Sequence, residues 1–353
     1  MISTLRQFYQ GKRVLLTGVH GFKGAWLAEL LLSLDADVYG VGLRDSTELL
    51  YDHLKLDERI VALVADIRSP EAARFIVESR PDVVIHLAAQ PLVKMGYDDP
   101  LETYSTNVLG TANVLSAVRY APGKVSTISV TTDKVYRNYE KLEGYVEDDE
   151  LCGIDPYSNS KSCAELVTFS MQESFFKGTL TTDEPKIVSS ARAGNVIAGG
   201  DFAADRIVPD LARALRSGES VKLRSPESVR PYQHALDVVA TYLYLAARQY
   251  DDPAVAGAYN VGPNRESVLR TIDLANFFVE RSPVEIEVVP ADFYETNYLW
   301  LNSEKLRTQL QWAPVWTTPH EILSPTFEWY DVWANGGDTA VVTREQIERF
   351  LHV

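Results

Sequence analysis

The sequence predicts an α/β protein with a doubly wound parallel sheet, to which a smaller mixed α/β lobe is attached. Short apolar runs alternate with helical patterns in the first half of the chain, which is typical of parallel sheets covered by helices. A glycine-rich loop joins the first of these runs to the first helix. After about residue 190 the alternation becomes irregular. These three observations predict a regular core followed by a second, smaller unit.

The first predicted strand, residues 14–16, leads into the loop 17–24, and a helix is expected over residues 25–34. The loop has the spacing Gly-x-x-Gly-x-x-Gly, which between a strand and a helix is typical of a dinucleotide site. Glycines let the backbone approach a pyrophosphate, and the helix N-terminus supplies free N–H groups. We therefore expect a Rossmann-type site, whose predicted contacts in this loop are Thr17, Gly18, Gly21, Phe22 and Gly24.

The second predicted strand, residues 37–42, ends just before Arg44 and Asp45. An acid at the tip of this strand would bind the adenosine ribose of NAD, whereas an arginine would favour the 2′-phosphate of NADP. The chain offers both residues at adjacent positions. The sequence therefore leaves the choice between NAD and NADP open.

Further strands are predicted over residues 61–65, 82–87, 125–130 and 186–191. The carboxyl ends of parallel strands meet at one edge of the sheet, and ligands bind there. Asp66 and Ile67 follow the third strand, and Asp66 is a candidate partner for the adenine amino group. Ala88 and Ala89 follow the fourth strand, and such small residues would let a cofactor lie flat across the strand ends.

A polar string follows the fifth predicted strand and is expected at the same edge. It contains Thr132, Asp133 and Lys134, and all three side chains are expected to point into the ligand site. A hydroxyl, a carboxyl and an amine together offer the groups that acid–base chemistry requires. We therefore treat this string as the first half of a candidate catalytic site.

The second half of the candidate site lies on a long helical pattern over residues 157–179. Tyr157 and Lys161 are four residues apart and so share one face of that helix. A phenol with a pKa of about 10 becomes a base at neutral pH only beside a fixed positive charge. Lys161 would supply this charge.

Composition excludes several classes of protein. The chain of 353 residues is 46% hydrophobic and 24% charged, as is usual for a globular protein. We find no apolar run of about 18 residues and no signal-peptide pattern, so we expect a cytoplasmic protein without membrane contacts. A net charge of -15 argues against a nucleic-acid partner. Only Cys152 and Cys163 are present, and neither a disulfide framework nor a metal site is expected from them.

The second half of the chain is predicted to build most of the lobe. Its expected elements are helices over residues 207–217, 235–250 and near 318–334, and a strand over 259–262. We predict a dinucleotide-binding domain over residues 1–190, to which a segment at about 232–258 returns. Residues 191–353 would mostly form a substrate-binding lobe, with the aromatic-rich stretch 294–300 in its core.

Taken together, these motifs resemble the extended short-chain dehydrogenase/reductase superfamily and, within it, the CDP-glucose 4,6-dehydratase family. The similar strings are Gly18-x-x-Gly21-Phe22-Lys23-Gly24, His86-Leu-Ala-Ala-Gln90, Thr131-Thr-Asp-Lys-Val-Tyr136, Asp155-Pro-Tyr-Ser-x-Ser-Lys161 and Arg230-Pro-x-Gln-His234. The resemblance extends from about residue 11 to past residue 300. The glycine loop and Tyr-x-x-x-Lys are common to the superfamily, whereas Asp-Lys after the fifth strand narrows the choice to sugar-nucleotide dehydratases.

The resemblance implies a dehydration of CDP-glucose to a 4-keto-6-deoxy sugar, with NAD as the cofactor. Tyr157, supported by Lys161, would take the proton of the C4 hydroxyl, which Thr132 would hold. Asp133 in its protonated form would give a proton to the leaving C6 oxygen. Lys134 would act either as the base at C5 or as a charged group that stabilises the enolate.

Further contacts are expected on the same grounds. Asn107, Tyr157 and Lys161 would complete the cofactor site. The candidate substrate contacts are Gln90, Asn195, Arg206, Arg230 and His234, of which the two arginines suit a diphosphate. The resemblance also implies a homodimer or a dimer of dimers, paired through the helices near residues 99–120 and 157–179.

Other functions stay open at this point. An inverting UDP-N-acetylhexosamine 4,6-dehydratase resembles the same combination of Thr-Asp-Lys and Tyr-x-x-x-Lys. A non-catalytic NAD(P)-sensing protein on this scaffold would typically have lost Tyr157 or Lys161, and this chain keeps both. A C4 epimerase is less favoured because it would not require Asp133 and Lys134.

Overall fold

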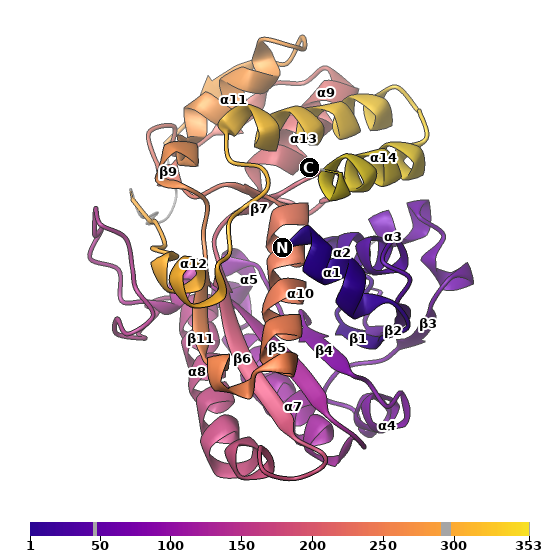
Figure 1. The fold of residues 1–353 in the computed structure, drawn as a ribbon. Helices are drawn as coiled ribbons and strands as arrows, with labels where there is room; N and C mark the ends of the chain where they lie inside the picture. Colours follow the sequence, from indigo (N-terminus) through magenta and orange to yellow (C-terminus); the bar gives the residue numbers. More distant parts are fainter. Residues whose placement is uncertain (45–47, 291–297, 353) are drawn as a thin grey trace.

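A seven-stranded sheet forms the centre of the protein in the computed structural model, which describes residues 1–44, 48–290 and 298–352 (Figure 1). In spatial order the strands are β11 (Ala258–Val261), β6 (Lys186–Ala193), β5 (Val125–Thr132), β4 (Val83–His86), β1 (Arg13–Thr17), β2 (Asp37–Gly42) and β3 (Val61–Val64). Every pair of neighbours is parallel. The strand order reverses between β1 and β4, which is where such sheets bind ligands. The predicted doubly wound parallel sheet is confirmed.

Helices cover both faces of this sheet (Figure 1). One layer comprises α1 (Ile2–Tyr9), α2 (Phe22–Leu32) and α10 (Ala235–Asp251), and the other comprises α4 (Pro70–Glu78), α7 (Gly110–Tyr120) and α8 (Pro156–Met171). Successive strand residues alternate between the two layers, so Leu16 and Ile85 belong to one hydrophobic cluster. Leu15 and Val84 belong to the other. This alternation explains why β1 and β4 are apolar along most of their length, on both faces of the sheet.

The remaining elements comprise a second group of helices, several short strands and several short helices. That group contains α9 (Ile207–Ser217), α11 (Thr271–Val279), α13 (Pro319–Ala334) and α14 (Thr339–Leu351), which gather at the top of Figure 1. Short strands pair as β7 (Val196–Ile197) with β10 (Gln233–His234), β8 (Val221–Leu223) with β13 (Ile286–Val288), and β9 (Val229–Arg230) with β12 (Leu269–Arg270). The other helices are α3 (Leu50–His53), α5 (Val93–Asp98), α6 (Pro100–Tyr104) and α12 (Glu304–Leu310). Because α10 and β11 belong to the sheet and its helix layers, the chain passes more than once between this core and the second group of helices. The domain bounds given above stay a prediction.

Local sequence signals explain several helix starts. Asp155 caps α8 by accepting the N–H of Ser158 at 3.0 Å, and Pro156 occupies the first turn. Thr318 and Glu321 form a reciprocal capping box at the start of α13. Such caps satisfy N–H groups that have no partner within the helix.

Some predicted bounds differ from the structure. α2 begins at Phe22 instead of residue 25, because Gly21 already adopts the extended N-cap conformation. The helix expected from residue 100 contains a π-helical segment, Ser105–Leu109, and the helix expected over 157–179 ends in a similar segment, Gln172–Phe176. Asp45 and residues 294–297 of the predicted aromatic stretch lie outside the described residues, while Leu299 of that stretch is buried. No helix in the described ranges has the length and apolar character that a membrane crossing requires.

Candidate active site

The glycine loop forms a cradle between the ends of β1 and β4. Gly18 has a φ of 72°, in the left-handed region that favours glycine. A Cβ at Gly18 would lie 2.8 Å from the backbone nitrogen of Ala88, so only glycine permits this close approach. The N-cap of α2 is Gly21, which has no side chain to cap the first N–H groups of the helix. These features fit a pyrophosphate, which free N–H groups and the helix dipole would bind.

Replacing Gly18 with alanine is expected to weaken NAD binding by about 5- to 150-fold, because backbone strain and a clash cost roughly 1–3 kcal/mol. Titration calorimetry with NAD measures this directly. Gly123→Ala is the matched control, since Gly123 has a φ of 79° but a Cβ added there would meet no described atom within 4 Å. An unchanged dissociation constant for Gly18→Ala would contradict the cradle as the cofactor site.

A buried chain of hydrogen bonds lies directly behind the cradle. The hydroxyl of Thr17 accepts the N–H of Ala88 at 3.1 Å and lies 2.7 Å from His86 Nδ1. On its other side His86 Nε2 lies 3.0 Å from the hydroxyl of Thr111. Burial lowers the pKa of His86 to about 3, so the ring stays neutral. The side chain of Thr17 therefore holds the end of β4 in place, and its predicted contact with the cofactor stays a prediction.

Asn107 and Gln90 are also engaged with the protein. Asn107 Oδ1 accepts the backbone N–H of Gln90 at 2.8 Å, and its Nδ2 donates to Ser160 Oγ of α8 at 2.8 Å. The Gln90 amide donates to Thr103 Oγ1 at 2.8 Å. Both side chains are buried. The structure shows them joining the β4 loop to the helices beside it, and direct contacts with cofactor or substrate stay predictions.

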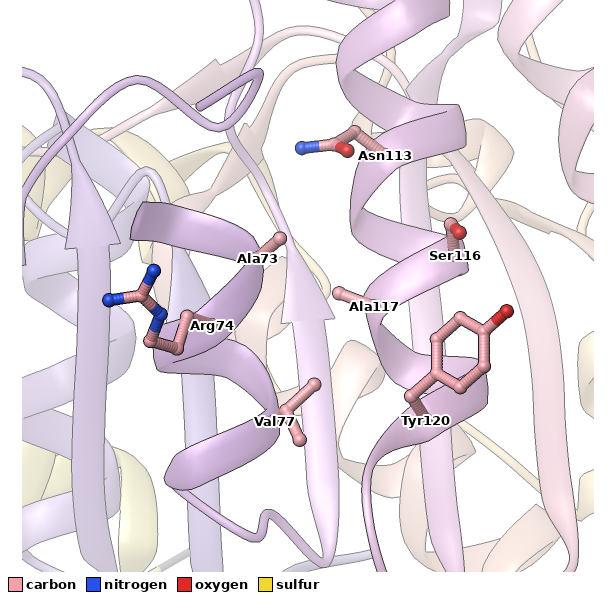
Figure 2. Close-up of a pocket in the computed structure, with 7 residues that line it drawn as sticks. All are labelled: Ala73, Arg74, Val77, Asn113, Ser116, Ala117 and Tyr120. Atoms are coloured by element: carbon pink, nitrogen blue, oxygen red, sulfur yellow. The ribbon is translucent and has the colours of Figure 1, made fainter. Parts of the chain in front are cut away.

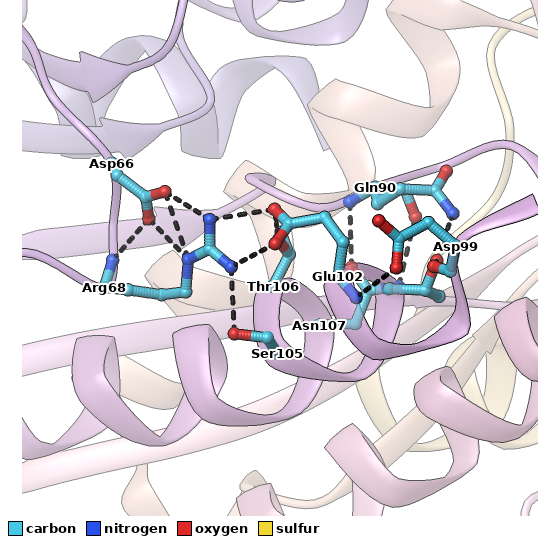
Figure 3. A network of polar contacts seen from close by, with 9 residues as sticks. Asp66, Arg68, Gln90, Asp99, Glu102, Ser105, Thr106 and Asn107 are labelled. Carbon is cyan, nitrogen blue, oxygen red and sulfur yellow. Dashed lines mark hydrogen bonds and ion pairs between the residues drawn. The ribbon is translucent and has the colours of Figure 1, made fainter. Parts of the chain in front are cut away.

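Asp66 and Ile67 lie at the end of β3, beside α6. Figure 3 shows that the Asp66 carboxylate is bound by Arg68, whose guanidinium also binds Glu102 at 2.8 Å. The Arg68 backbone N–H donates to Asp66 Oδ1 at 2.8 Å as well. Hydrogen bonds from Arg68 lower the pKa of Asp66, so this carboxylate is ionised and held in one position. Ile67 is buried. The position is compatible with the predicted adenine contact.

The polar string after β5 is arranged around the carboxylate of Asp133. Asp133 Oδ1 accepts the hydroxyl of Thr132 at 2.8 Å and pairs with Lys134 Nζ at 3.2 Å. Asp133 is fully buried, and its Oδ2 has no hydrogen-bond partner within the described ranges. Lys134 is half-buried and reaches solvent. One oxygen of Asp133 is thus occupied by its neighbours, and the other is buried without a hydrogen-bond partner among the described residues.

α8 places Tyr157 and Lys161 beside this string. Lys161 Nζ donates to the carbonyl oxygen of Val130 in β5 at 3.3 Å, and both side chains are largely buried. Burial raises the pKa of Tyr157 to about 12, although a hydrogen bond with Thr132 lowers it. Burial and the charge of Lys23 lower the pKa of Lys161 to about 7. The phenol is therefore protonated at neutral pH here, opposite to the direction expected from the sequence, because burial outweighs the nearby positive charge.

Lys23 is a site residue to which sequence reasoning assigned no role. Burial and the charge of Arg206 lower its pKa to about 8, while Asp201 and Asp133 act in the opposite direction. Lys23 also influences Lys161, so it lies among the charged groups of the site. The signal was present in the string Phe22-Lys23-Gly24, since a lysine inside a glycine loop is a charged group beside the cofactor cradle.

Three predicted substrate contacts lie on the lobe side. Arg206 binds Asp201 at 2.9 Å, and its charge acts on the phenol of Tyr157, so the structure brings it to the site. The Arg230 guanidinium donates to the carbonyl of its neighbour Val229 at 3.0 Å. Asn195 Oδ1 is buried and has no partner within the described ranges. All three stay predictions as substrate contacts, and Arg206 has the most direct support.

His234 lies in the interior of the protein, beside the start of α10. It is fully buried, and its ring lies 5.6 Å from that of Trp26 and 4.5 Å from that of Trp316. Its Nδ1 accepts the N–H of Leu236 at the start of α10. A direct substrate contact would require these aromatic rings to move. The position favours a structural role, and the predicted substrate contact remains without support.

Other features of the surface do not add to this site. Figure 2 shows a shallow groove between α4 and α7, bordered by Arg74, Asn113 and Tyr120. It contains none of the candidate site residues. Within the described ranges, no group of three or more His, Cys, Asp or Glu side chains could hold a metal ion.

The parallel sheet, the glycine cradle, and Tyr157 and Lys161 beside it define a member of the extended short-chain dehydrogenase/reductase class. Residues 15–323 match the model of the family described as GDP-mannose 4,6 dehydratase, and the chain belongs to this family. The predicted superfamily is thereby confirmed.

Individual relatives agree with this assignment. The chain is 37% identical to the CDP-glucose 4,6-dehydratase of Salmonella typhimurium strain LT2, an alignment that covers 98% of each chain. Among solved structures, the epimerase Mth375 of Methanothermobacter thermautotrophicus has a TM-score of 0.81 at 21% identity, covering 98% of this chain and 97% of its own. A double mutant of DesIV, a dTDP-glucose 4,6-dehydratase of Streptomyces venezuelae bound to NAD and DAU, has a TM-score of 0.77 at 20% identity, covering 93% and 99%. At these identities the two structures support the fold alone.

Proposed function

We propose that this chain is an NAD-dependent CDP-glucose 4,6-dehydratase, which forms CDP-4-keto-6-deoxyglucose. The observation that carries the proposal is the position of Asp133, buried between Thr132 and Lys134 at the end of β5 and beside Tyr157. A simple dehydrogenase or epimerase needs no such acid and base next to its tyrosine. The full-length similarity to a CDP-glucose 4,6-dehydratase supports the substrate.

The cradle at Gly18 and Gly21, together with Asp66, Ala88 and Ala89, would hold the cofactor. When bound, the cofactor would supply a hydride acceptor for C4 of the sugar and a hydride donor for C6. Phe22, Gly24, Ile67 and Asn107 would complete this binding site.

Tyr157 and Thr132 would act at C4. Tyr157 removes the proton of the C4 hydroxyl, and Thr132 holds the same oxygen by hydrogen bonding. Lys161 lies on the same face of α8, and its positive charge together with that of the oxidised nicotinamide would offset the burial that raises the pKa of Tyr157, so that the tyrosine can act as a phenolate. Because these groups are largely buried, water is excluded and their electrostatic interactions are strong.

Asp133 and Lys134 would carry out the elimination. The ketone at C4 acidifies the C5 hydrogen, which Lys134 removes, while Asp133 protonates the C6 hydroxyl so that water leaves. In the structure Lys134 Nζ and Asp133 Oδ1 form an ion pair 3.2 Å long. Transfer of one proton from Lys134 to Asp133 would give the neutral amine and the protonated carboxyl that this step requires. Lys134 then returns its proton to C5, so the pair requires no outside base.

One proton must still be returned after each turnover. At the end of the reaction Tyr157 has gained the proton of the C4 hydroxyl, and Asp133 has lost the one that left with water. Thr132 interacts with both groups, through a hydrogen bond that lowers the pKa of Tyr157 and a 2.8 Å bond to Asp133. Its hydroxyl would therefore pass the proton from phenol to carboxylate.

On the substrate side, Arg206 and Arg230 would bind the diphosphate, for which guanidinium groups are well shaped. Asn195, whose side-chain oxygen is unpaired within the described ranges, would bind the diphosphate or a sugar hydroxyl. Gln90 and His234 are buried and would act by supporting the loops beside the substrate.

The test is a parallel incubation of the purified protein and NAD with CDP-glucose and with UDP-N-acetylglucosamine. A product that has lost one water from CDP-glucose alone, detected by mass spectrometry, is the expected result. Product from the UDP sugar alone would transfer the chain to the inverting hexosamine dehydratases. NAD binding without turnover of either sugar would favour the non-catalytic sensing protein.

We also expect a homodimer, because a contiguous helical face is apolar and exposed. Leu101, Leu109, Leu166 and Phe169 have exposed fractions of 82%, 63%, 55% and 62%, on α6, the π-helical segment and α8, which pack together. Exposed apolar side chains on helices that pack together are typical of an interface between subunits. The double variant Leu166→Glu, Phe169→Glu is expected to be a monomer by light scattering, and Leu142→Glu, at an exposed leucine elsewhere, is the control. An unchanged mass would contradict this interface.

A further inference from the structure

The tip of β2 carries a cluster of charged and aromatic side chains that we call the β2-tip cluster: His20, Arg44, Tyr51, Asp52 and Asp57. Arg44 Nη1 donates to Asp57 Oδ2 at 2.7 Å, and Arg44 Nη2 forms a second ion pair with Asp52. Tyr51 donates its hydroxyl to the other oxygen of Asp57 at 2.9 Å. The guanidinium of Arg44 is therefore shared between two carboxylates.

This cluster borders the glycine cradle. A Cβ at Gly42, the last residue of β2, would lie 3.1 Å from the Cα of Gly18. His20 belongs to the glycine loop itself, and its ring lies 4.6 Å from that of Tyr51. In dinucleotide-binding folds the residues at this strand tip meet the 2′ position of the adenosine ribose, where an arginine favours NADP. The β2-tip cluster is thus at the position that distinguishes the two cofactors.

The net charge of the β2-tip cluster opposes the preference for NADP that an arginine at this position usually gives. Arg44 contributes one positive charge, and Asp52 and Asp57 contribute two negative charges. A hydrogen bond from Arg44 lowers the pKa of Asp57, which is therefore ionised. Burial and the charge of Arg44 lower the pKa of His20, which is therefore neutral and adds no positive charge. Counting the described members of the cluster alone, a 2′-phosphate would meet a net charge of about -1 and would have to displace both carboxylates from the guanidinium.

We propose that Asp52 and Asp57 neutralise Arg44 and thereby make the chain select NAD over NADP. The inference rests on the proposed nicotinamide cofactor and deepens it. Each ion pair is partly exposed and weak on its own, but discrimination depends on the sum of charges that the phosphate meets. The 2′-hydroxyl of NAD is neutral and meets no such repulsion.

The test compares dissociation constants for NAD and NADP, measured by titration calorimetry without any sugar nucleotide. The wild-type protein is expected to bind NAD more tightly. In the double variant Asp52→Asn, Asp57→Asn, Arg44 is released, and the ratio of the two constants is expected to move towards NADP by about tenfold or more. This shift should shrink in salt of about 1 M, because exposed charges are screened.

Two controls isolate the cause. Glu58→Gln removes one negative charge from the same turn, at an exposed residue that forms no ion pair with Arg44 in the described structure, and it is expected to leave the ratio unchanged. Adding Arg44→Gln to the double variant should remove the gain in NADP binding. An unchanged ratio in the double variant, or tighter binding of NADP by the wild type, would overturn the inference while leaving the dehydratase intact. Binding of neither dinucleotide would overturn the proposed function as well.

Discussion

Tyr157→Phe is expected to lower kcat for dehydration of CDP-glucose by about 10³-fold, within the range that general base catalysis contributes. The substitution removes the phenolic oxygen that takes the C4 proton and leaves the ring that fills the space beside α8. Tyr157 is largely buried, and its replacement is nearly isosteric, so the fold should be retained. Steady-state rates with CDP-glucose measure the loss, and thermal unfolding monitors the fold.

Tyr120→Phe is the matched control, because Tyr120 is an exposed tyrosine of α7 outside the site. Its rate is expected to equal that of the wild type. The affinity for NAD should fall much less than kcat in Tyr157→Phe, since the substitution removes one predicted cofactor contact and leaves the cradle and the β2 tip intact. A rate of Tyr157→Phe above roughly one tenth of the wild-type value would assign the C4 proton to another group.

The second large effect concerns stability. Arg192 of β6 and Glu165 of α8 form an ion pair of 2.8 Å in which both side chains are at most 4% exposed. Ser190 also donates to Glu165 at 2.7 Å, and Arg192 donates to Tyr136 at 2.7 Å. Arg192→Met leaves the carboxylate of Glu165 buried without its cation and is expected to cost about 3–5 kcal/mol of unfolding free energy. Urea denaturation measures this loss.

The double variant Arg192→Met, Glu165→Gln tests the physical cause. Removing both charges together should cost less than the two single substitutions added, because no unpaired charge then remains. Arg137→Met breaks an exposed pair with Glu150 and is expected to change stability by no more than about 1 kcal/mol. Additive losses in the double variant would show that the pair itself contributes little.

The parts of the site that depend on local order along the chain were predictable from the sequence. The loop with Gly18 and the string at Asp133 each follow directly from a strand, so the topology of the sheet places them at one edge. Tyr157 and Lys161 were predictable because their spacing matches a helix. The protonation state of Tyr157 was not predictable, since burial by segments distant in the sequence raises its pKa.

The parts of the site that depend on contacts between residues far apart in the sequence could not be predicted from the order of the chain. His234 belongs to a motif that suggested substrate binding, yet Trp26 and Trp316 enclose it. Arg44 left the choice between NAD and NADP open, and the sequence did not show that Asp52 and Asp57 lie beside it. The sequence places Lys23 in the glycine loop but does not show that its charge reaches Lys161.

The late return of the chain to the sheet has a consequence for synthesis on the ribosome. β6 pairs with β5 along its whole length, but its other edge is covered only by β11, whose register joins Ala258 to Ser190 within the described ranges. The whole segment between Ala193 and Ala258 is therefore translated after β6 before that edge finds its partner. During this interval the nascent chain exposes unpaired backbone groups of a strand whose residues are all buried in the finished protein. Pairing with β11 ends this exposure.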